Sequence, residues 1–563
     1  MKRLKIIALA LLPLAAFAAE WDFPDGGDPK LVVPHSEELA FPDGFKATLR
    51  FSVDREKIGK TDFANLFCKG YNFEGGYCVM LRKRGCLLID LKGVTPSYYM
   101  HTSQFESNRE YLLEMYVTTN AVRVFIDGKE EGSYLYQRKF DFSTKAPLTI
   151  GSMGGYPLPG SIKHLKLEPI SAVTLPPGGP HAVVSEPPKR QARAEILWSK
   201  PICVEKDRYI GWPTVCRLRN GDILAVFSGD RDAHVCPWGK VQLVRSTDGG
   251  ETWSDPETIQ NGPIDDRDAG LVQLPDGDLV LTWFTSDFYR TSFHPGEHMK
   301  PDDPVYWWKR HDEKIAPEVR AASLGYFRSV SKDNGRTWSK PMRMSGVGNA
   351  PHGPSVMQDG SLVQLGISGA TRTVNGQKKS CTRVCVSRSA DKGATWQSLC
   401  DDVPWTGDEG EGKMLLDEPH VLQLADGSLV GMVRFNADKD HWGDHYLRQT
   451  VSRDGGRTWS PTVRTDIIGF PPHLLQLADG KLICVYGRRR SDPGFGEFAV
   501  ISDDGGRTWD VRNEIVLRRH DDGDLGYPSS CQLPDGSILT VYYHPQKLSE
   551  KPCLMATKWR VTR

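Results

Sequence analysis

The stretch that decides the fold is LDEPHVLQLADGSLVGMVR, which runs from Leu416 to Arg434. Apolar residues alternate with polar ones on both sides of Asp426-Gly427, and this is a strong signal for two strands joined by a tight turn. The first strand begins with polar residues that include Glu418, and the second ends at Arg434. The stretch therefore predicts a β-hairpin that carries charged side chains at its open end.

The hairpin pattern occurs six times between residue 212 and the end of the chain, each time with a glycine in its turn. The turn glycines are Gly221, Gly277, Gly360, Gly427, Gly480 and Gly536. The residue nine positions before each glycine stands at the start of the first strand, and we call these six the strand-start positions. They hold Trp212, Asp268, Pro351, Glu418, Pro471 and Tyr527. One geometric position thus carries a different chemical group in almost every repeat.

A second motif, Ser-x-Asp-x-Gly-x-Thr-Trp, alternates with the hairpins. Its copies occupy residues 246–253, 331–338, 389–396, 452–459 and 502–509. In such a turn the Asp accepts hydrogen bonds from N–H groups, the Gly permits a positive φ and the Trp is buried. Repeats of four short strands predict radial blades. We therefore expect a six-bladed β-propeller over residues 195–563, in which the strand at 195–198 completes the last blade.

The part of the chain before the propeller divides into three segments. Residues 1–19 have the basic, apolar and small-residue regions of a secretory signal. Short strands fill residues 20–170 and predict a β-sandwich, so the whole chain is expected to be all-β. The hairpin YVTTNAVRVFIDGKEEG at 116–132 resembles those of the laminin-G and concanavalin-A-like jelly rolls. Proline and glycine dominate residues 171–194, as in a stiff linker between domains.

The composition limits the classes of function. The chain has 563 residues, of which 71 are basic and 71 acidic, so it lacks the excess of positive charge that holds a nucleic acid. No segment is long and apolar enough for a membrane span. The 12 cysteines show no compact disulfide framework and no complete set of metal ligands. We expect an exported bacterial monomer, located in the periplasm, at the cell surface or in the medium, without a cofactor or metal.

The Asp-containing turns, the blades and the strand-start residues together resemble the sialidase (neuraminidase) superfamily from residue 195 onward. Members carry a Glu in a segment like Glu418-Pro-His-Val-Leu-Gln-Leu, followed by a strand that ends in an Arg such as Arg434. They also carry a nucleophilic Tyr in a last-blade motif like Gly-Tyr527-Pro-Ser-Ser. A Tyr activated by a neighbouring Glu suits sialic acid, because a carboxylate nucleophile would be repelled by the carboxylate of the sugar.

The resemblance also implies an acid/base and a cluster of arginines. The family places an Asp on a loop after the first blade's strand, and Asp232 is the matching residue here, with Asp230 as the alternative. Arginines clamp the substrate carboxylate, and we expect Arg434, Arg488 and Arg231 in this role. The first family arginine is absent, since the matching motif is Gly211-Trp212-Pro213.

Other residues at the same ends of the repeats are expected to line the pocket. Three histidines stand close to strand starts, and an Arg-Asp pair opens the second repeat. The predicted lining residues are Trp212, Arg267, Asp268, His352, His420 and His473.

Three functions are compatible with this pattern. The first is an exo-α-sialidase that removes terminal sialic acid from glycoconjugates such as mucin-type glycans, with Tyr527 and Glu418 as nucleophile pair and Asp232 as acid/base. The second is another propeller glycosidase, or a polysaccharide lyase, that acts on a different acidic sugar through His and Tyr. The third is a glycan-binding protein without catalytic activity.

Overall fold

The structure is a computed structural model that divides into two compact units, one ending at Val183 and the other comprising Val184–Arg490 and Gly494–Arg563. It describes residues 18–562 except for 24–29, 59–62, 71–75, 83–86, 92–97, 101–104, 120, 136–139, 141, 143, 153–156, 171–188, 294–302, 375–376, 406–414, 437–445, 490–494, 521–522 and 548–549. Most of the expected signal segment and most of the expected linker lie outside these described residues.

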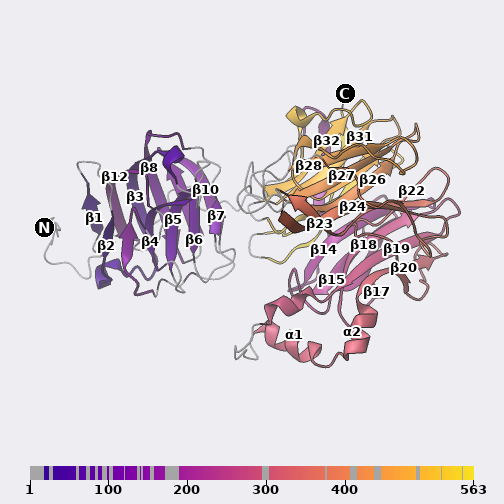
Figure 1. The fold of residues 1–563 in the computed structure, drawn as a ribbon, viewed down its shortest axis with the longest axis horizontal. Helices are drawn as coiled ribbons and strands as arrows, with labels where there is room; N and C mark the ends of the chain where they lie inside the picture. The colour runs from indigo at the N-terminus through magenta and orange to yellow at the C-terminus, as the bar shows by residue number, and fades with distance from the viewer. Residues whose placement is uncertain are drawn as a thin grey trace. The chain divides into compact units, whose positions relative to one another are not determined.

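The first unit is a sandwich of two six-stranded antiparallel sheets (Figure 1). One sheet has the order β1 (Ala19–Asp22), β12 (Gly160–Pro169), β3 (Gly44–Val53), β8 (Glu110–Thr118), β9 (Ala121–Ile126) and β10 (Lys129–Leu135). The other has the order β2 (Leu31–Val33), β11 (Leu148–Ile150), β4 (Phe63–Lys69), β5 (Tyr77–Arg82), β6 (Leu87–Leu91) and β7 (Tyr98–Met100). Alternate residues of both sheets form one apolar core between them, as the period of two requires.

The second unit consists of six four-stranded antiparallel sheets (Figure 1). The first sheet contains β14 (Tyr209–Arg217), β15 (Ile223–Arg231), β16 (Lys240–Ser246) and β17 (Glu257–Gln260). The second contains β18 (Asp265–Gln273), β19 (Leu279–Ser286), β20 (Gly325–Ser331) and β21 (Met342–Met344). The third contains β22 (Ser355–Val356), β23 (Leu362–Val374), β24 (Gln377–Ser389) and β25 (Gln397–Cys400). The fourth sheet contains β26 (Leu415–Gln423), β27 (Leu429–Asn436), β28 (Tyr446–Ser452) and β29 (Val463–Ile468). The fifth contains β30 (Pro472–Gln476), β31 (Leu482–Arg488), β32 (Phe495–Ser502) and β33 (Ile515–His520). The sixth contains β34 (Gly526–Gln532), β35 (Ile538–His544), β36 (Cys553–Val561) and β13 (Ala194–Cys203).

The first strands of these sheets form a closed ring, because β14, β18, β22, β26, β30 and β34 contact one another in this order and β34 contacts β14. The strand that closes the ring comes from the opposite end of the unit, since β13 pairs with β36 from Ala194 to Cys203. The propeller and the completion of its last sheet by the N-terminal strand are therefore confirmed. Apolar residues of neighbouring sheets interdigitate in separate clusters around the ring.

The five Asp-containing turns form with the predicted hydrogen bonds to Asp, but of their Trp side chains only Trp459 is buried and the other four are half-buried. In the turn at 452–459, Asp454 accepts hydrogen bonds from the backbone N–H of Thr458 at 2.9 Å and from its hydroxyl at 2.6 Å. Gly456 has a φ of 93° and donates its N–H to Ser452 at 3.0 Å. Trp459 is buried between two sheets and donates to the carbonyl of Gly456. The Trp of this turn thus packs two neighbouring sheets together.

An insertion between β19 and β20 carries the α-helices that the structure describes in this unit. It contains the 3₁₀ helix η3 (Phe288–Ser292) and the α-helices α1 (Pro304–Asp312) and α2 (Pro317–Ser323), which Figure 1 shows at one edge of the propeller. Short 3₁₀ turns occur elsewhere, at η1 (Glu37–Leu39), η2 (Arg55–Lys57) and η5 (Val511–Asn513). No helix among the described residues could cross a bilayer. Most of the cysteines that the structure describes are buried.

Candidate active site

Four of the six strand-start residues have a left-handed backbone. The φ angles are 55° at Trp212, 48° at Asp268, 40° at Glu418 and 53° at Tyr527. At each of them the first strand has one residue more than its partner, so the register shifts. Such a bulge redirects a side chain, and a positive φ is strained for residues of this size. The fixed φ of proline excludes this backbone at the other two positions, Pro351 and Pro471.

The bulges bring Tyr527 and Glu418 together from two sheets that are not neighbours in the ring. The phenol of Tyr527 donates a hydrogen bond to Oε1 of Glu418, and Nη1 of Arg434 forms an ion pair with Oε2 of the same carboxylate. Tyr527 is 4% exposed. Arg434 is fixed further by Asn436, whose side-chain oxygen accepts from its Nε at 2.8 Å. The structure therefore unites the three residues that the hairpin pattern selected.

The charge state of this pair suits a nucleophile with a neighbouring base. Burial raises the pKa of Tyr527 well above its usual value, and the carboxylate of Glu418 raises it further, while two arginines oppose the shift. The phenol is therefore protonated at neutral pH and needs a base to become nucleophilic. Glu418 is the acceptor of its hydrogen bond and is in position to take that proton.

The expectation for Arg488 is corrected by the structure. Its guanidinium forms an ion pair with Glu514 and lies over the ring of Phe498 at 4.0 Å. The next residue, Arg489, lies instead over the ring of Tyr527 at 5.7 Å. The reason is the alternation of side chains along a strand, which sends consecutive residues to opposite faces. Arg489 is therefore a functional candidate that sequence reasoning missed by one position.

Trp212 is the centre of a second group of residues. The guanidinium groups of Arg231 and Arg267 lie 4.7 Å and 4.1 Å from the centre of its ring. Arg231 is fully buried and forms a two-point ion pair with Asp265. It is therefore not available to bind a substrate, in contrast to the expectation from the sequence. Arg267 makes only longer contacts, at 3.3 Å to Asp265 and 3.2 Å to a backbone carbonyl. Arg267 is thus the cation of this group that can turn to a ligand.

Asp268 is a buried carboxyl group without a strong partner. It is 6% exposed, and its Oδ1 has no hydrogen-bond partner among the described residues. Burial raises its pKa to about 7, the charge of Glu418 acts in the same direction, and Arg267 opposes both. Asp268 therefore exchanges its proton near neutral pH and can donate or accept a hydrogen bond at the floor of the site.

Both carboxylate oxygens of Asp232 accept hydrogen bonds from protein groups. Its Oδ1 forms an ion pair with Arg208, and its Oδ2 accepts from the indole N–H groups of Trp238 and Trp308. Burial favours a higher pKa for Asp232, but these hydrogen bonds outweigh it and lower the pKa below the usual value. Trp308 belongs to α1, so Asp232 attaches the helical insertion to the loop after β15.

The three predicted histidines converge at the centre of the ring. The ring centroids of His420 and His473 are 4.4 Å apart, and His352 lies 5.1 Å from His473 and 6.5 Å from Tyr527. All three are buried, and burial lowers the pKa of each of them. They are therefore neutral at physiological pH and form a packed layer next to Tyr527.

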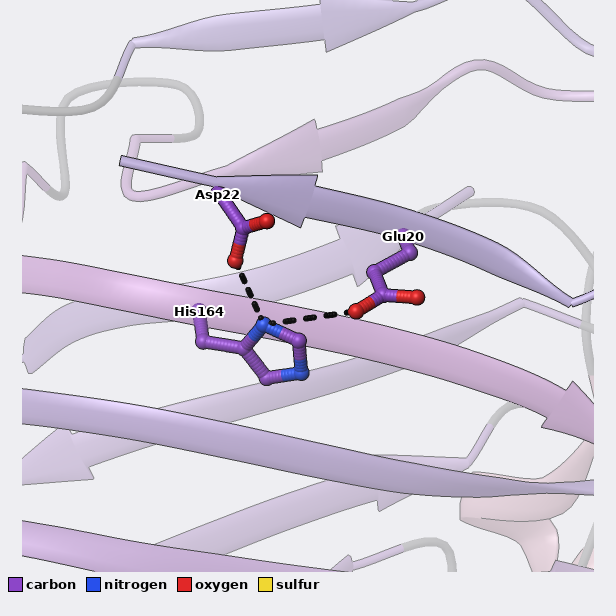
Figure 2. Close-up of side chains that lie close together, drawn as sticks. All are labelled: Glu20, Asp22 and His164. Carbon is purple, nitrogen blue, oxygen red and sulfur yellow. Dashed lines mark hydrogen bonds and ion pairs between the residues drawn. The ribbon is translucent and has the colours of Figure 1, made fainter. Parts of the chain in front are cut away.

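In the first unit, one group of potential metal ligands occurs among the described residues. Figure 2 shows Glu20 and Asp22 of β1 beside His164 of β12. Nδ1 of His164 lies 2.8 Å from Asp22 and 3.8 Å from Glu20. The side chains of Asp22 and Glu20 are 73% and 49% exposed, so water surrounds both carboxylates. An imidazole between two carboxylates explains this arrangement without an ion, and we assign no ligand to it.

Comparisons with known proteins agree with the repeats. The family described as "BNR repeat-like domain" matches residues 314–540. The chain is similar to a protein of unknown function from Dyadobacter fermentans, with 20% identity and a TM-score of 0.50 over 66% of this chain and 99% of that one. It is also similar to the NanB sialidase of Streptococcus pneumoniae, with 13% identity and a TM-score of 0.44 over 97% of this chain and 99% of that one. The Hadza microbial sialidase Hz136 has 15% identity and a TM-score of 0.44, with coverage of 97% and 99%.

The Dyadobacter structure supports the fold, and the family match supports the identity of the repeats. Residues 314–540 thus match a BNR repeat-like domain and lie within the β-propeller, and the similarity to the Dyadobacter structure is a similarity of fold.

Proposed function

We propose that this protein is an exo-α-sialidase that hydrolyses terminal sialic acid from glycoconjugates such as mucin-type glycans. The observation that carries the proposal is the hydrogen bond from the phenol of Tyr527 to Glu418, next to the guanidinium groups of Arg434 and Arg489. A tyrosine with its own base is a neutral nucleophile, and the arginines offer a site for an anion. This combination suits a sugar whose anomeric carbon carries a carboxylate.

In the proposed reaction, the phenol oxygen of Tyr527 attacks the anomeric carbon while its proton passes to Glu418. The product of this step is a glycosyl-tyrosine, which water then hydrolyses, so the configuration at the anomeric carbon is retained. The ion pair with Arg434 keeps Glu418 oriented toward the phenol. The strained backbone at both residues supports a functional role, because strain of this kind is concentrated at active sites.

Three arginines are proposed to bind the substrate carboxylate. Arg434 and Arg489 are both close enough to Tyr527 for their charges to lower the pKa of its phenol. No hydrogen bond among the described residues uses Nη2 of Arg434, which leaves this group free for a ligand. Arg267 is proposed to replace the arginine that is missing at the position of Gly211, because it extends over the ring of Trp212 in the same part of the site.

The decisive test uses the variant Tyr527→Phe with two substrates, a fluorogenic aryl sialoside and a sialylated mucin. Wild-type protein is expected to release free sialic acid from both. Removal of the phenol oxygen should lower turnover by at least about a thousandfold, because no bond to the anomeric carbon can form. Tyr542→Phe is the matched control. Tyr542 is buried on the face of β35 opposite to Tyr543, and its hydroxyl is hydrogen-bonded to that of Thr557.

The products separate this proposal from its alternatives. An unsaturated or neutral sugar would indicate a lyase or a different glycosidase, and glycan binding without release would indicate a binding protein. The burial of His352, His420 and His473 gives no specific support to a mechanism that uses them as acids, because their lowered pKa values keep them neutral.

A further inference from the structure

We propose that His234 is the group that gives a proton to the departing glycosidic oxygen and later takes a proton from the attacking water. This inference rests on the proposed function and assigns its acid/base step to a residue outside the motif that named Asp232. The inference follows from the availability of Asp232 and His234 for proton transfer, from the position of the imidazole of His234, and from the hydrogen bonds that fix the tautomer of this imidazole.

Asp232 is unavailable for proton transfer because it serves as an anchor. Both of its oxygens are bonded to protein donors, namely Arg208 on one side and the indoles of Trp238 and Trp308 on the other. A carboxylate with three donors holds no proton to give, and a proton on it would break the attachment of α1 to the loop. Its function in this structure is to hold that loop in place.

His234 lies two residues further along the same loop and reaches the opening of the site. Its ring centroid is 4.9 Å from that of Trp212, which in turn lies 6.3 Å from that of Tyr527. The side chain of His234 is 42% exposed, in contrast to the buried Tyr527. An exo-acting enzyme releases its leaving group toward solvent, so a proton donor is required at this level and not at the floor.

The hydrogen bonds of His234 determine which ring nitrogen is free. Tyr209 donates its hydroxyl hydrogen to Asp524 at 2.7 Å, and Nδ1 of His234 lies 2.8 Å from the same hydroxyl. The only hydrogen of that hydroxyl is already committed, so Nδ1 must be the donor. No hydrogen bond among the described residues uses Nε2. In neutral His234, Nε2 is therefore the basic nitrogen, as a proton shuttle requires.

The backbone of His234 is held as firmly as its ring. Its carbonyl accepts hydrogen bonds from Arg231 and from Arg267, both at 3.2 Å. Tyr209 and Asp524 come from β14 and from the segment before β34, so the imidazole is fixed by the first and the last sheets of the ring. A loop residue whose ring and backbone are both hydrogen-bonded is positioned well enough for catalysis.

The charges around His234 couple its proton to the substrate. Burial lowers its pKa, and the cations Arg489 and Arg267 lower it further, while the carboxylate of Asp524 raises it. A substrate carboxylate bound by these two arginines would offset their charge. The imidazole then binds a proton more readily when a substrate is present than when the site is empty.

Asp268 is a second candidate proton donor, because burial raises its pKa to about 7, but its position excludes it from this step. It is 6% exposed and lies at the bulge of β18, where the charge of Glu418 acts on it and its own charge raises the pKa of Tyr527. A donor there faces the nucleophile and not the leaving group. Asp268 is suited to bind a hydroxyl group of the sugar.

The balanced sequence has two steps. In the first, the bond from Tyr527 oxygen to the anomeric carbon forms, the phenol proton passes to Glu418, and the glycosidic bond breaks with its electron pair on the leaving oxygen, which takes the proton from Nε2 of His234. In the second, a water oxygen bonds to the anomeric carbon and gives a proton to Nε2, while the bond to Tyr527 breaks and its oxygen recovers the proton from Glu418. The net reaction is hydrolysis with retention.

The test compares His234→Asn and Asp232→Asn on two substrates with different leaving groups. Sialyllactose has an alkoxide leaving group that needs protonation, whereas an aryl sialoside has a phenolate that does not. For His234→Asn, kcat/KM is expected to fall about 10²- to 10⁴-fold on sialyllactose and by less than about tenfold on the aryl sialoside. Asp232→Asn is expected to lower Tm without this dependence on the leaving group.

Asp524→Asn tests the charge that acts on the imidazole. The carboxylate of Asp524 lies 3.6 Å from Nδ1 of His234 and raises the pKa of the imidazole in the wild type. The alkaline limb of kcat/KM on sialyllactose should therefore move to lower pH in this variant, an effect that a purely structural role of Asp524 does not produce. Thermal unfolding of each variant separates these effects from loss of fold.

The outcomes distinguish this inference from the proposed function. If the wild type releases sialic acid from neither substrate, the proposed function fails and the inference fails with it. If the wild type is active and His234→Asn affects both substrates equally, or neither, the assignment to His234 is overturned while the function stands. A leaving-group dependence in Asp232→Asn but not in His234→Asn would also overturn it.

Discussion

At the scale of single residues, Asp268 shows how the strand-start position of a carboxyl group changes the pKa of that group. The same position holds an aromatic ring in two other repeats and a carboxylate in a third, and each time a bulge directs the side chain into one shared space. Glu418 has an arginine to stabilise its charge, whereas Asp268 has an unpaired oxygen. Burial then outweighs its more distant cations and favours the protonated form.

This difference predicts a dependence of stability on pH. The pKa of Asp268 is about 7 in the folded protein and 3.8 in the reference state. Between these values the folded state binds more protons, so its contribution to stability decreases as pH rises, by up to about 1.4 kcal/mol per pH unit. Asp268→Asn cannot ionise, and its Tm relative to wild type should therefore increase from pH 4 to pH 7. A difference in Tm that is constant over this range would show that Asp268 is ionised throughout.

At the scale of elements, β31 determines which of two adjacent arginines reaches the site. Arg488 shares its partner Glu514 with Tyr486, two residues earlier on the same face of the strand. Arg489 belongs to the opposite face, where Tyr527 and Tyr543 lie. A side-chain period of two therefore separates a structural arginine from a functional one.

The pair of variants Arg488→Ala and Arg489→Ala tests this separation. Arg489→Ala should raise KM for an aryl sialoside by about tenfold to a hundredfold, since a charge-assisted contact to the substrate carboxylate is lost. Arg488→Ala should instead lower Tm, because Glu514 loses its ion-pair partner, with little change in KM. Steady-state kinetics and thermal unfolding of both variants give the comparison, and the reverse pattern would restore Arg488 as the substrate ligand.

The Asp-containing turns predict a different response to acid. Hydrogen bonds from the hydroxyl and the backbone N–H of Thr458 lower the pKa of Asp454 to about 2 from 3.8. A lowered pKa means that the turn contributes stability above pH 4 and loses it as pH falls toward 2. Asp454→Asn should therefore lower Tm at pH 7 and have progressively less effect as pH falls from 4 to 2. Equal effects at pH 7 and pH 2.5 would contradict a role for the charge.

At the scale of the whole molecule, closure of the ring depends on β13. This strand covers the outer edge of β36 from Ala194 to Cys203, and its Ala194 and Ile196 belong to an apolar cluster with residues of β31 and β32. A propeller without its closing strand exposes a β-edge and part of its core. The sheets of the second unit therefore depend on a segment more than 300 residues away in the sequence.

Two shortened chains test the role of this strand. A chain that begins at Val184 keeps the whole second unit and should unfold in one cooperative transition. A chain that begins at Glu205 lacks β13 and should aggregate or unfold at least about 10 °C lower, because the edge of β36 is unprotected. Circular dichroism and size-exclusion chromatography measure both properties. Identical melting curves for the two chains would show that closure does not need β13.

The sequence by itself determined the elements and their repetition. Alternation on both sides of a turn glycine, and the Ser-x-Asp-x-Gly-x-Thr-Trp motif, are local patterns that depend on backbone angles and on the period of a strand. They predicted the hairpins, the propeller and the shared position of Glu418 and Tyr527. The count of nine residues from each glycine succeeded because the bulge occurs at the same place in four repeats.

Only the tertiary structure decided which charged side chains meet in the site. Arg489 rather than Arg488 faces Tyr527, because the face of β31 depends on its pairing with neighbouring strands. Asp232 is bound by Trp308 from an insertion, and His234 is oriented by Tyr209 and Asp524 from opposite ends of the propeller. These contacts join residues up to 315 positions apart. They arise because closure of the ring brings side chains of distant sheets together, and no local pattern of residues specifies which of these side chains meet.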